Sequence, residues 1–133
     1  MHLQATPRYN TWVGLSFERL CFAHIYEIQR ALGVTGVATK TYSYTTPTAQ
    51  MDMVIERADR VTTLCEMKYT QKPYQMSKSE ADKLRNRAEE LAMLQPTQRQ
   101  IQIVLISNRN AKKNINYNSL VVNNITLKDI FKS

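Results

Sequence analysis

The stretch QMDMVIERADRVTTLCEMK, residues 50–68, decides the fold of this chain. Both of its halves are rich in Val, Ile, Thr and Met and alternate with polar residues, which is the pattern of half-buried strands. The polar triplet at residues 58–60 supplies turn chemistry between the two halves. The stretch therefore predicts an antiparallel β-hairpin.

The length of the loop sets which residues face each other, because side chains alternate between the two faces of a sheet. A three-residue loop places Asp52 opposite Glu66 and Gln50 opposite Lys68, with all four side chains on one face. A two-residue loop would instead put Cys65 across from Asp52. With the three-residue loop, the reverse face carries a largely apolar set suited to a core: Met51, Met53, Ile55, Thr63, Cys65 and Met67.

The opposed acids suggest a cation site. Two carboxylates with Cβ atoms roughly 5 Å apart destabilise a strand pair unless something compensates their charge, and Mg²⁺ or Mn²⁺ is suited to do so. Lys68 could position or deprotonate a water that attacks a phosphodiester, or stabilise charge on the phosphorus centre. An E-x-K triplet alone usually marks a solvated strand face or a cross-strand ion pair. The acid at Asp52 favours the catalytic hypothesis, because an exposed face would not favour opposed acids.

This set of residues resembles the active site of the PD-(D/E)XK nuclease superfamily, whose members share a helix with an acid, three strands bearing D and E-x-K, a helix and a further strand. Residues 14–18, GLSFE, resemble the G-x-x-x-E opening of archaeal Holliday-junction resolvases. More closely, the chain resembles the nuclease-like C-terminal domain found behind an archaeal-type AAA ATPase in many bacterial proteins. The segments that carry the resemblance are residues 12–18, 31–37, 49–52, 64–68, 84–86 and 126–131.

The resemblance implies an α/β fold of order αβββαβ, a restriction-endonuclease-like core with a mixed sheet flanked by helices. It implies that Asp52, Glu66 and Glu18 hold Mg²⁺ or Mn²⁺, that Lys68 assists the attacking water, and that Gln50 orients Lys68 or the phosphate. The proline that names the superfamily is absent, since Gln50 and Met51 precede Asp52.

The chain also lacks the G-x-x-x-x-G-K-[ST] phosphate loop, so it cannot hydrolyse ATP by that route. It is either a stand-alone copy of the domain or a fragment of a longer ATPase. An AAA ATPase domain and a second copy of the chain are the protein partners that the resemblance implies.

Composition bounds the remaining possibilities. The chain has 133 residues, which fits one domain, and 43% of them are hydrophobic, enough for a modest core. No apolar stretch approaches the roughly 20 residues that span a bilayer, and residues 1–8 lack the apolar core of a signal peptide, so we expect a cytoplasmic protein without membrane contact. Cys21 and Cys65 are expected to be buried and reduced, and His24 to be structural.

The net charge of +7 is unevenly distributed. Residues 1–70 hold 7 basic and 6 acidic side chains, whereas residues 71–133 hold 11 and 5. Such an excess favours association with nucleic acid, with DNA the first expectation, although plain solubility explains it as well. The side chains predicted to contact phosphates are Lys83, Arg87, Arg109, Lys112 and Lys113. A catalytically inactive module that binds nucleic acid, or docks on a partner ATPase, is the alternative to an enzyme.

The remaining elements follow from local patterns. Residues 1–11 are polar and are expected to form an arm or the remnant of a linker, with the nuclease-like domain over residues 12–133. Apolar residues at three- and four-residue steps predict a helix over residues 14–32, ended by Gly33. Further predictions are a strand at residues 34–44, a helix at residues 78–94 begun by a capping box, a central strand at residues 100–107, a short strand at residues 120–122 and a turn capped by Thr126.

Overall fold

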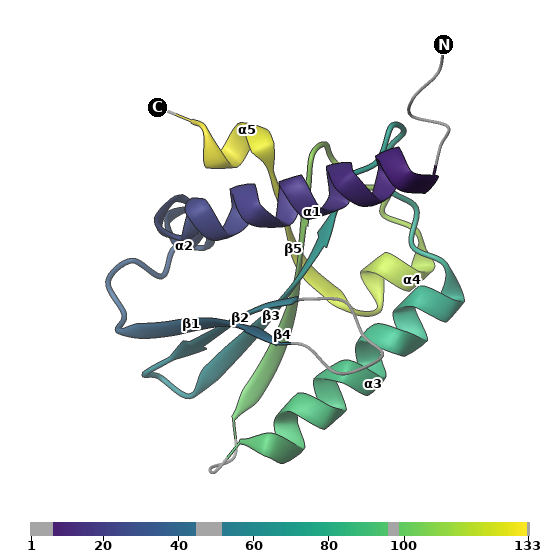
Figure 1. Cartoon of the computed structure of the whole chain (residues 1–133). Helices are drawn as coiled ribbons and strands as arrows, with labels where there is room; N and C mark the ends of the chain where they lie inside the picture. The colour runs from purple at the N-terminus through teal and green to yellow at the C-terminus, as the bar shows by residue number, and fades with distance from the viewer. Residues whose placement is uncertain (1–6, 45–51, 96–98, 133) are drawn as a thin grey trace.

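The computed structural model describes residues 7–44, 52–95 and 99–132, which form an α/β fold around a five-stranded mixed sheet (Figure 1). No helix within these ranges combines the length and apolar character needed to cross a membrane. The elements in chain order are α1 Pro7–Ala23, α2 Ile25–Leu32, β1 Thr39–Tyr44, β2 Asp52–Arg57, β3 Val61–Lys68, α3 Lys78–Leu94, β4 Gln100–Ser107, α4 Ile115–Asn118, β5 Val121–Thr126 and α5 Leu127–Ile130.

The five strands lie in the order of the sequence, from β1 at one edge to β5 at the other. The first three are antiparallel neighbours, whereas β3, β4 and β5 run parallel to one another. The two parallel connections are made through α3 and through α4, as parallel neighbours require a crossover. The predicted mixed sheet flanked by helices is therefore confirmed.

The hairpin between β2 and β3 has the predicted three-residue loop. Met53 pairs with Cys65 and Ile55 with Thr63, which is the register that the three-residue loop requires. Arg60 ends the loop with a φ of 68°, the left-handed conformation expected at the last position of such a loop. Continued by one residue to the start of β2, this register brings Asp52 and Glu66 onto the same face.

Two helical layers cover the sheet. The helices α1, α2 and α5 lie on one face, and α3 and α4 on the other (Figure 1). Alternate residues of β2 and β3 enter the two layers. The core under α1, α2 and α5 takes Met53, Ile55, Cys65 and Met67 from these strands, and the core under α3 and α4 takes Val54 and Leu64.

The prediction of a single helix over residues 14–32 is wrong at its start and in its middle. The first helix begins at Pro7, a residue suited to a first helical turn, so residues 7–11 of the predicted arm are helical. It stops at Ala23, and α2 follows after a non-helical His24. The His24 ring packs edge-on against Phe131 at 4.9 Å between centroids. The end at Gly33, with φ of 74°, is confirmed.

The two outer strands also differ from the prediction. The first strand starts at Thr39, not at residue 34, and residues 34–38 form a turn instead. The last strand runs from Val121 to Thr126 and is twice as long as expected. The capping box at Ser77, the final turn that begins at Thr126 and the strand at residues 100–107 are confirmed.

Both cysteines are buried and free, as expected. Burial raises the pKa of the Cys21 thiol to about 12, and it also raises that of Cys65. Both thiols therefore remain protonated at neutral pH and act as core residues, because only the thiolate is an effective nucleophile or metal ligand.

Candidate functional site

The predicted acid pair lies between the sheet and α3. Asp52, the first residue of β2, has 0% of its surface exposed, and Glu66, near the end of β3, has 5%. Tyr44 of β1 pairs with Asp52 on one side, and Leu105 of β4 pairs with Glu66 on the other. Two carboxylates thus sit side by side in a row of largely apolar neighbours, where an unpaired charge is costly.

Arg87 of α3 bridges the two acids. Its Nη1 donates to Asp52 Oδ2 at 2.6 Å and to Glu66 Oε2 at 3.2 Å, and 13% of the Arg87 side chain is exposed. One guanidinium therefore faces two carboxylates. Asp52 Oδ1 is buried and makes no hydrogen bond within the described residues.

The acids are incompletely compensated by Arg87. Burial, together with repulsion from Glu66, raises the pKa of Asp52 to about 7 against the opposing effect of Arg87. Burial also raises the pKa of Glu66, against the opposing effects of Lys68 and Arg87. Two unit charges about 5 Å apart at an effective dielectric constant near 20 repel by about 3 kcal/mol. The pair therefore attracts cations.

Lys68 is held at the edge of the same site by the start of α3. Its Nζ lies 3.6 Å from Glu80 Oε2 and 5.6 Å from the centroid of the Tyr74 ring. The Tyr74 hydroxyl donates to Glu80 Oε2 at 2.7 Å, and the backbone N–H of Ser77 donates to Glu80 Oε1 at 3.2 Å. Although burial raises the pKa of Glu80, these hydrogen bonds hold it below its ordinary value, so Glu80 stays anionic beside the Lys68 ammonium.

Glu18 approaches the site from α1. Burial raises its pKa, and so does the charge of Glu66, while Lys68 lowers it. Within residues 7–44, 52–95 and 99–132, however, no three His, Cys, Asp or Glu side chains converge closely enough to hold a metal ion. Glu18 is therefore an electrostatic neighbour of the acid pair and does not complete a ready-made triad with it.

The donor chemistry of the acid pair nevertheless fits Mg²⁺. Both acids offer oxygen ligands, and Asp52 Oδ1 is a buried oxygen without a hydrogen-bond partner in the described chain. The assignment of Asp52, Glu66 and Glu18 as ligands stays a prediction. Gln50 lies outside the described residues, so its predicted role also stays a prediction.

The predicted nucleic-acid contacts fall into two groups. Lys83 is exposed on α3, one turn before Arg87. The structure places Arg87 itself between the acids, a position that its sequence pattern did not predict. The other group is exposed in the loop between β4 and α4 and comprises Arg109, Lys112 and Lys113.

This basic loop is fastened beside the segment that leaves Lys68. The Lys112 backbone N–H donates to the Tyr74 carbonyl at 2.8 Å, and the Asn114 side chain donates to the Met76 carbonyl at 2.9 Å. Asn108 and Asn116 donate in the same way to the carbonyls of Thr70 and Met76, so the asparagine side chains tie the loop to this segment. They bring the exposed lysines close to the segment that positions Lys68.

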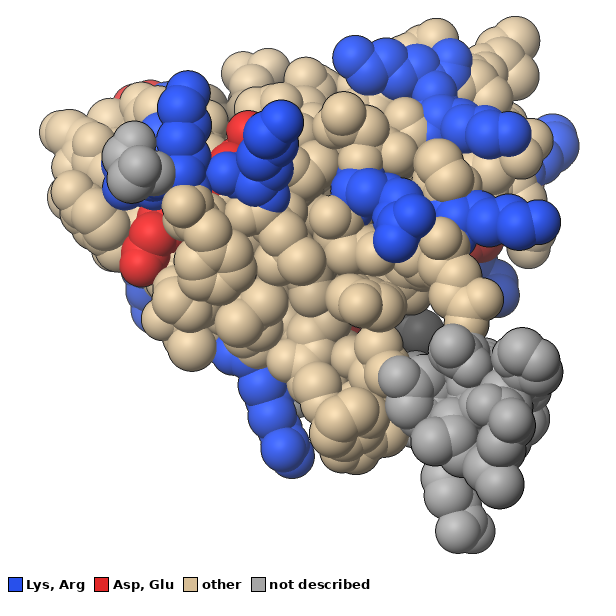
Figure 2. Space-filling view, turned by 90° about the horizontal axis from the view of Figure 1, so that it is seen from above, with Lys and Arg blue, Asp and Glu red and all other residues tan. Residues whose placement is uncertain are grey.

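Figure 2 looks down on the molecule of Figure 1, onto α1, α5 and the loops that follow β3 and β4. The charged side chains on this face are mostly lysine and arginine, with few acidic groups between them. Such a face attracts polyanions through long-range electrostatics.

Three residues of the site were not assigned to it from sequence: Arg87 as the partner of the acids, and Glu80 and Tyr74 as the supports of Lys68. A helical pattern could have indicated Arg87, because it lies three residues after Leu84 and four before Leu91, at the border of the buried stripe of α3. Glu80 was recognised only as a capping residue, and Tyr74 precedes the helix without any local signal.

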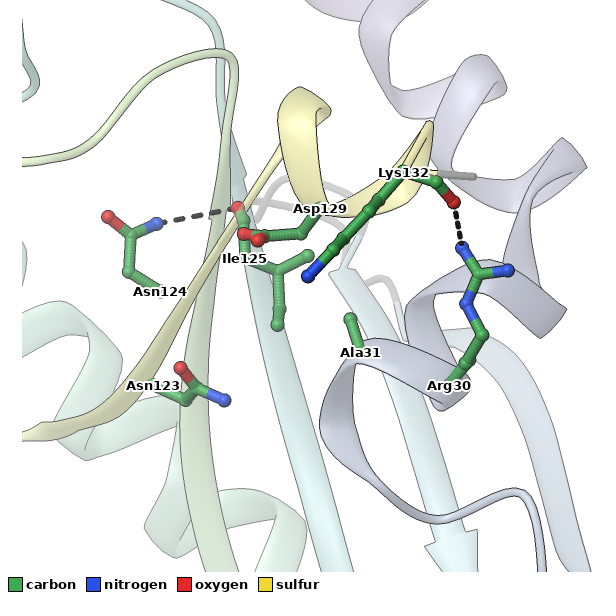
Figure 3. A pocket seen from close by; sticks show the side chains of 7 residues that line it. All are labelled: Arg30, Ala31, Asn123, Asn124, Ile125, Asp129 and Lys132. Carbon is green, nitrogen blue, oxygen red and sulfur yellow. Dashed lines mark hydrogen bonds between the residues drawn. The ribbon is translucent and has the colours of Figure 1, made fainter.

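A separate cavity of about 520 Å³ opens beside β5, between α2 and α5 (Figure 3). Two of its charged side chains are already engaged. Arg30 donates to the carbonyls of Ile130 and Lys132, and Asp129 accepts from Thr126. The cavity contains none of the predicted site residues, and its contacts tie α2 to the end of the chain.

No family model, curated protein or solved structure matches this chain. The class that fold and site define is therefore an α/β protein with a buried acid pair and a lysine on one face of a mixed sheet. Any closer assignment has to be argued from the residues themselves.

Proposed function

We propose that this protein hydrolyses phosphodiester bonds of nucleic acid, with DNA as the first candidate, through a Mg²⁺-dependent site of the PD-(D/E)XK type on a restriction-endonuclease-like core. One observation carries the proposal. Asp52 and Glu66 come from neighbouring strands, share a buried face, and are followed two residues later on that face by Lys68. The order of helix, three strands, helix and strand supports it.

Asp52 and Glu66 would hold the ion, with Asp52 Oδ1 as an oxygen that makes no hydrogen bond in the described chain. Mg²⁺ would supply Lewis-acid polarisation of a phosphate oxygen. Lys68 then lies on the face that meets the phosphate, where its ammonium group can orient the attacking water or stabilise negative charge as the P–O bond breaks. Glu80 and Tyr74 restrict where that ammonium group can lie.

The test is cleavage of plasmid, single-stranded and branched DNA, and of RNA, with and without Mg²⁺ or Mn²⁺. Lys68→Ala should lower the rate by about 10²- to 10⁴-fold, as expected for loss of a positioned proton-transfer or charge-stabilising group. Lys72→Ala, at an exposed position four residues later, is the matched control and should cleave like the unmodified protein. Equal rates in the unmodified protein and Lys68→Ala reject the proposal.

A second function is favoured by the position of Arg87. Its guanidinium bonds to both acids, so the charge of Arg87 can take the place of a metal ion. The protein would then be a non-catalytic module that binds nucleic acid through its exposed lysines or docks on an AAA ATPase. Such a module would gain no thermal stability from Mn²⁺, whereas a competent site would gain it. Steep weakening of binding with salt identifies phosphate contacts, and salt-insensitive binding identifies a protein partner.

An AAA ATPase partner and a homodimer belong to the same proposal. Size-exclusion chromatography with light scattering would show whether two copies associate in the absence of DNA.

A further inference from the structure

Arg87 occupies the part of the site that a metal ion would need. A single nitrogen, Nη1, serves both acids, at 2.6 Å from Asp52 Oδ2 and 3.2 Å from Glu66 Oε2. The guanidinium therefore stands between the two carboxylates, which is also the position from which one divalent ion would contact both. Its positive charge offsets the repulsion between the two carboxylates, as the charge of a metal ion would.

The contact differs from a satisfied structural ion pair. A buried carboxylate that belongs to a permanent pair normally has both oxygens hydrogen-bonded, since an unsatisfied buried oxygen is costly. Asp52 is fully buried, yet its Oδ1 has no hydrogen-bond partner among the described residues. Arg87 thus covers one oxygen of each acid and leaves the coordinating capacity of Asp52 incompletely used.

The helix that carries Arg87 is held on the sheet by other side chains. It rises from the middle of α3, beside the stripe formed by Ala81, Leu84 and Leu91, and those residues anchor the helix to the sheet. The Arg87 side chain is itself partly exposed, so it borders solvent. An arginine side chain has several rotatable bonds, and a rotamer change is enough to move its head group.

We propose that Arg87 is an internal cation that closes the acid pair in the metal-free protein and that a divalent ion must displace it to bind. The inference rests on the proposed function, because it concerns the same acids. Competition of this kind is reciprocal: the guanidinium contact weakens metal binding by the same factor by which bound metal weakens the guanidinium contact.

The test is isothermal titration calorimetry of the full chain with Mn²⁺. Arg87→Gln removes the competing charge and should bind Mn²⁺ at least about ten-fold more tightly than the unmodified protein, a change of about 1.4 kcal/mol. Arg85→Gln is the matched control, because Arg85 lies on the same helix but bonds to Asp82 and Ser119. It should bind Mn²⁺ as the unmodified protein does.

The outcomes separate this inference from the proposed function. Equal or weaker binding by Arg87→Gln, with measurable binding by the unmodified protein, overturns the role of Arg87 and leaves the metal-dependent function standing. No binding by any folded variant overturns both.

A second measurement covers the case in which Arg87→Gln does not fold. In the unmodified protein, Mg²⁺ should shift the Nε–Hε resonance of Arg87 in an NMR titration and leave that of Arg85 in place. If Mg²⁺ saturably shifts the backbone amides of β2 and β3 while the Arg87 resonance stays unmoved, the inference is wrong. If Mg²⁺ shifts neither, the inference and the proposed function both fail.

Discussion

The two faces of the β2–β3 hairpin are built from alternate residues of the same strands, and they have opposite character. On the face under α1 and α2, Met53, Cys65 and Met67 pack into a largely apolar core. On the face under α3, their immediate neighbours Asp52 and Glu66 bring two buried carboxylates together. One strand pair thus supplies an apolar core on one side and a buried acid pair on the other.

The difference teaches that the site depends on its own reverse face. Buried acids side by side destabilise a sheet, and the apolar face compensates for that cost by burying methionine and cysteine side chains almost completely. The residues that hold these two strands in the sheet are therefore different from those of the acid pair. Substitutions in the apolar core should affect mainly stability, and substitutions at or near the acid pair should affect mainly pH dependence and activity.

The largest effect is expected on the apolar face. Met53→Ala removes a fully buried side chain and should lower the free energy of unfolding by about 2–5 kcal/mol, through reduced burial and a residual cavity. Met93→Ala is the control, because Met93 is 87% exposed and its replacement should change stability by less than about 0.5 kcal/mol. Urea unfolding measures both, and similar destabilisation of the two variants would contradict the contrast between core and surface.

The acid face should make the protein less stable as pH rises. The pKa of Asp52 lies near 7 in the folded protein, above its ordinary value of 3.8. The protonated carboxyl therefore contributes its full stabilisation below about pH 4, and this contribution is lost as pH rises through 7. This group alone contributes at most about 1.4 kcal/mol per pH unit.

Asp52→Asn should therefore flatten the decline in the free energy of unfolding between pH 4 and pH 7. Part of the slope should remain, because the pKa values of Glu66 and Glu18 are raised in the same direction. Arg87 can still donate to an amide oxygen at this position. Urea unfolding from pH 4 to pH 8 provides the comparison, and identical slopes in both proteins would show that Asp52 does not titrate in this window.

A smaller effect is expected from the support of Lys68. Glu80→Gln preserves the capping box, in which glutamine also serves, but removes the negative charge 3.6 Å from Lys68 Nζ. Cleavage should slow by about ten-fold, on the scale of one charged hydrogen bond, and its pH profile should shift, with little change in stability.

Tyr74→Phe keeps the ring beneath the ammonium group and removes only the hydroxyl, so its effect should be smaller than that of Glu80→Gln. Rates measured across pH distinguish a positioning role from a structural one. An unaltered rate and pH profile in Glu80→Gln would show that Glu80 merely caps α3.

The smallest effect is expected at the basic loop. Replacing Lys112 and Lys113 together by glutamine should weaken DNA binding only a few-fold, and should lower the slope of log affinity against log salt by about one for each phosphate that the loop no longer neutralises. Lys40→Gln, near the start of β1, is the control and should leave the slope unchanged. Fluorescence anisotropy over a range of salt concentrations measures the slopes, and equal slopes would place the phosphate-binding side chains elsewhere.

The hairpin could be predicted because its rules are local. Loop length and alternation set the register. Arg60 takes the left-handed backbone conformation that closes a three-residue loop. The start of the first strand could not be predicted in this way, since residues 34–38 also alternate. Pairing begins only at Thr39 because its partner strand ends at Arg57, with the Ala58 backbone N–H bonded to the Ala38 carbonyl.

The last strand and the break in the first helix depend on distant residues. Asn123 and Asn124 have low strand propensity, yet the Asn124 side chain bonds to Ser107 and accepts the Ala111 backbone N–H, which holds β5 in the sheet. His24 packs against Phe131 from the other end of the chain. Neither contact has a signal in the neighbouring sequence.

The sequence by itself determined that Asp52, Glu66 and Lys68 share one face, because a strand repeats every two residues and the loop has three. Only the tertiary structure decided what fills the space between the acids. Arg87 comes from a helix that the sequence placed correctly along the chain, but the packing of that helix on the sheet set where the guanidinium lies. Periodicity assigns a residue to a face, whereas the opposing partner depends on how two separate elements dock.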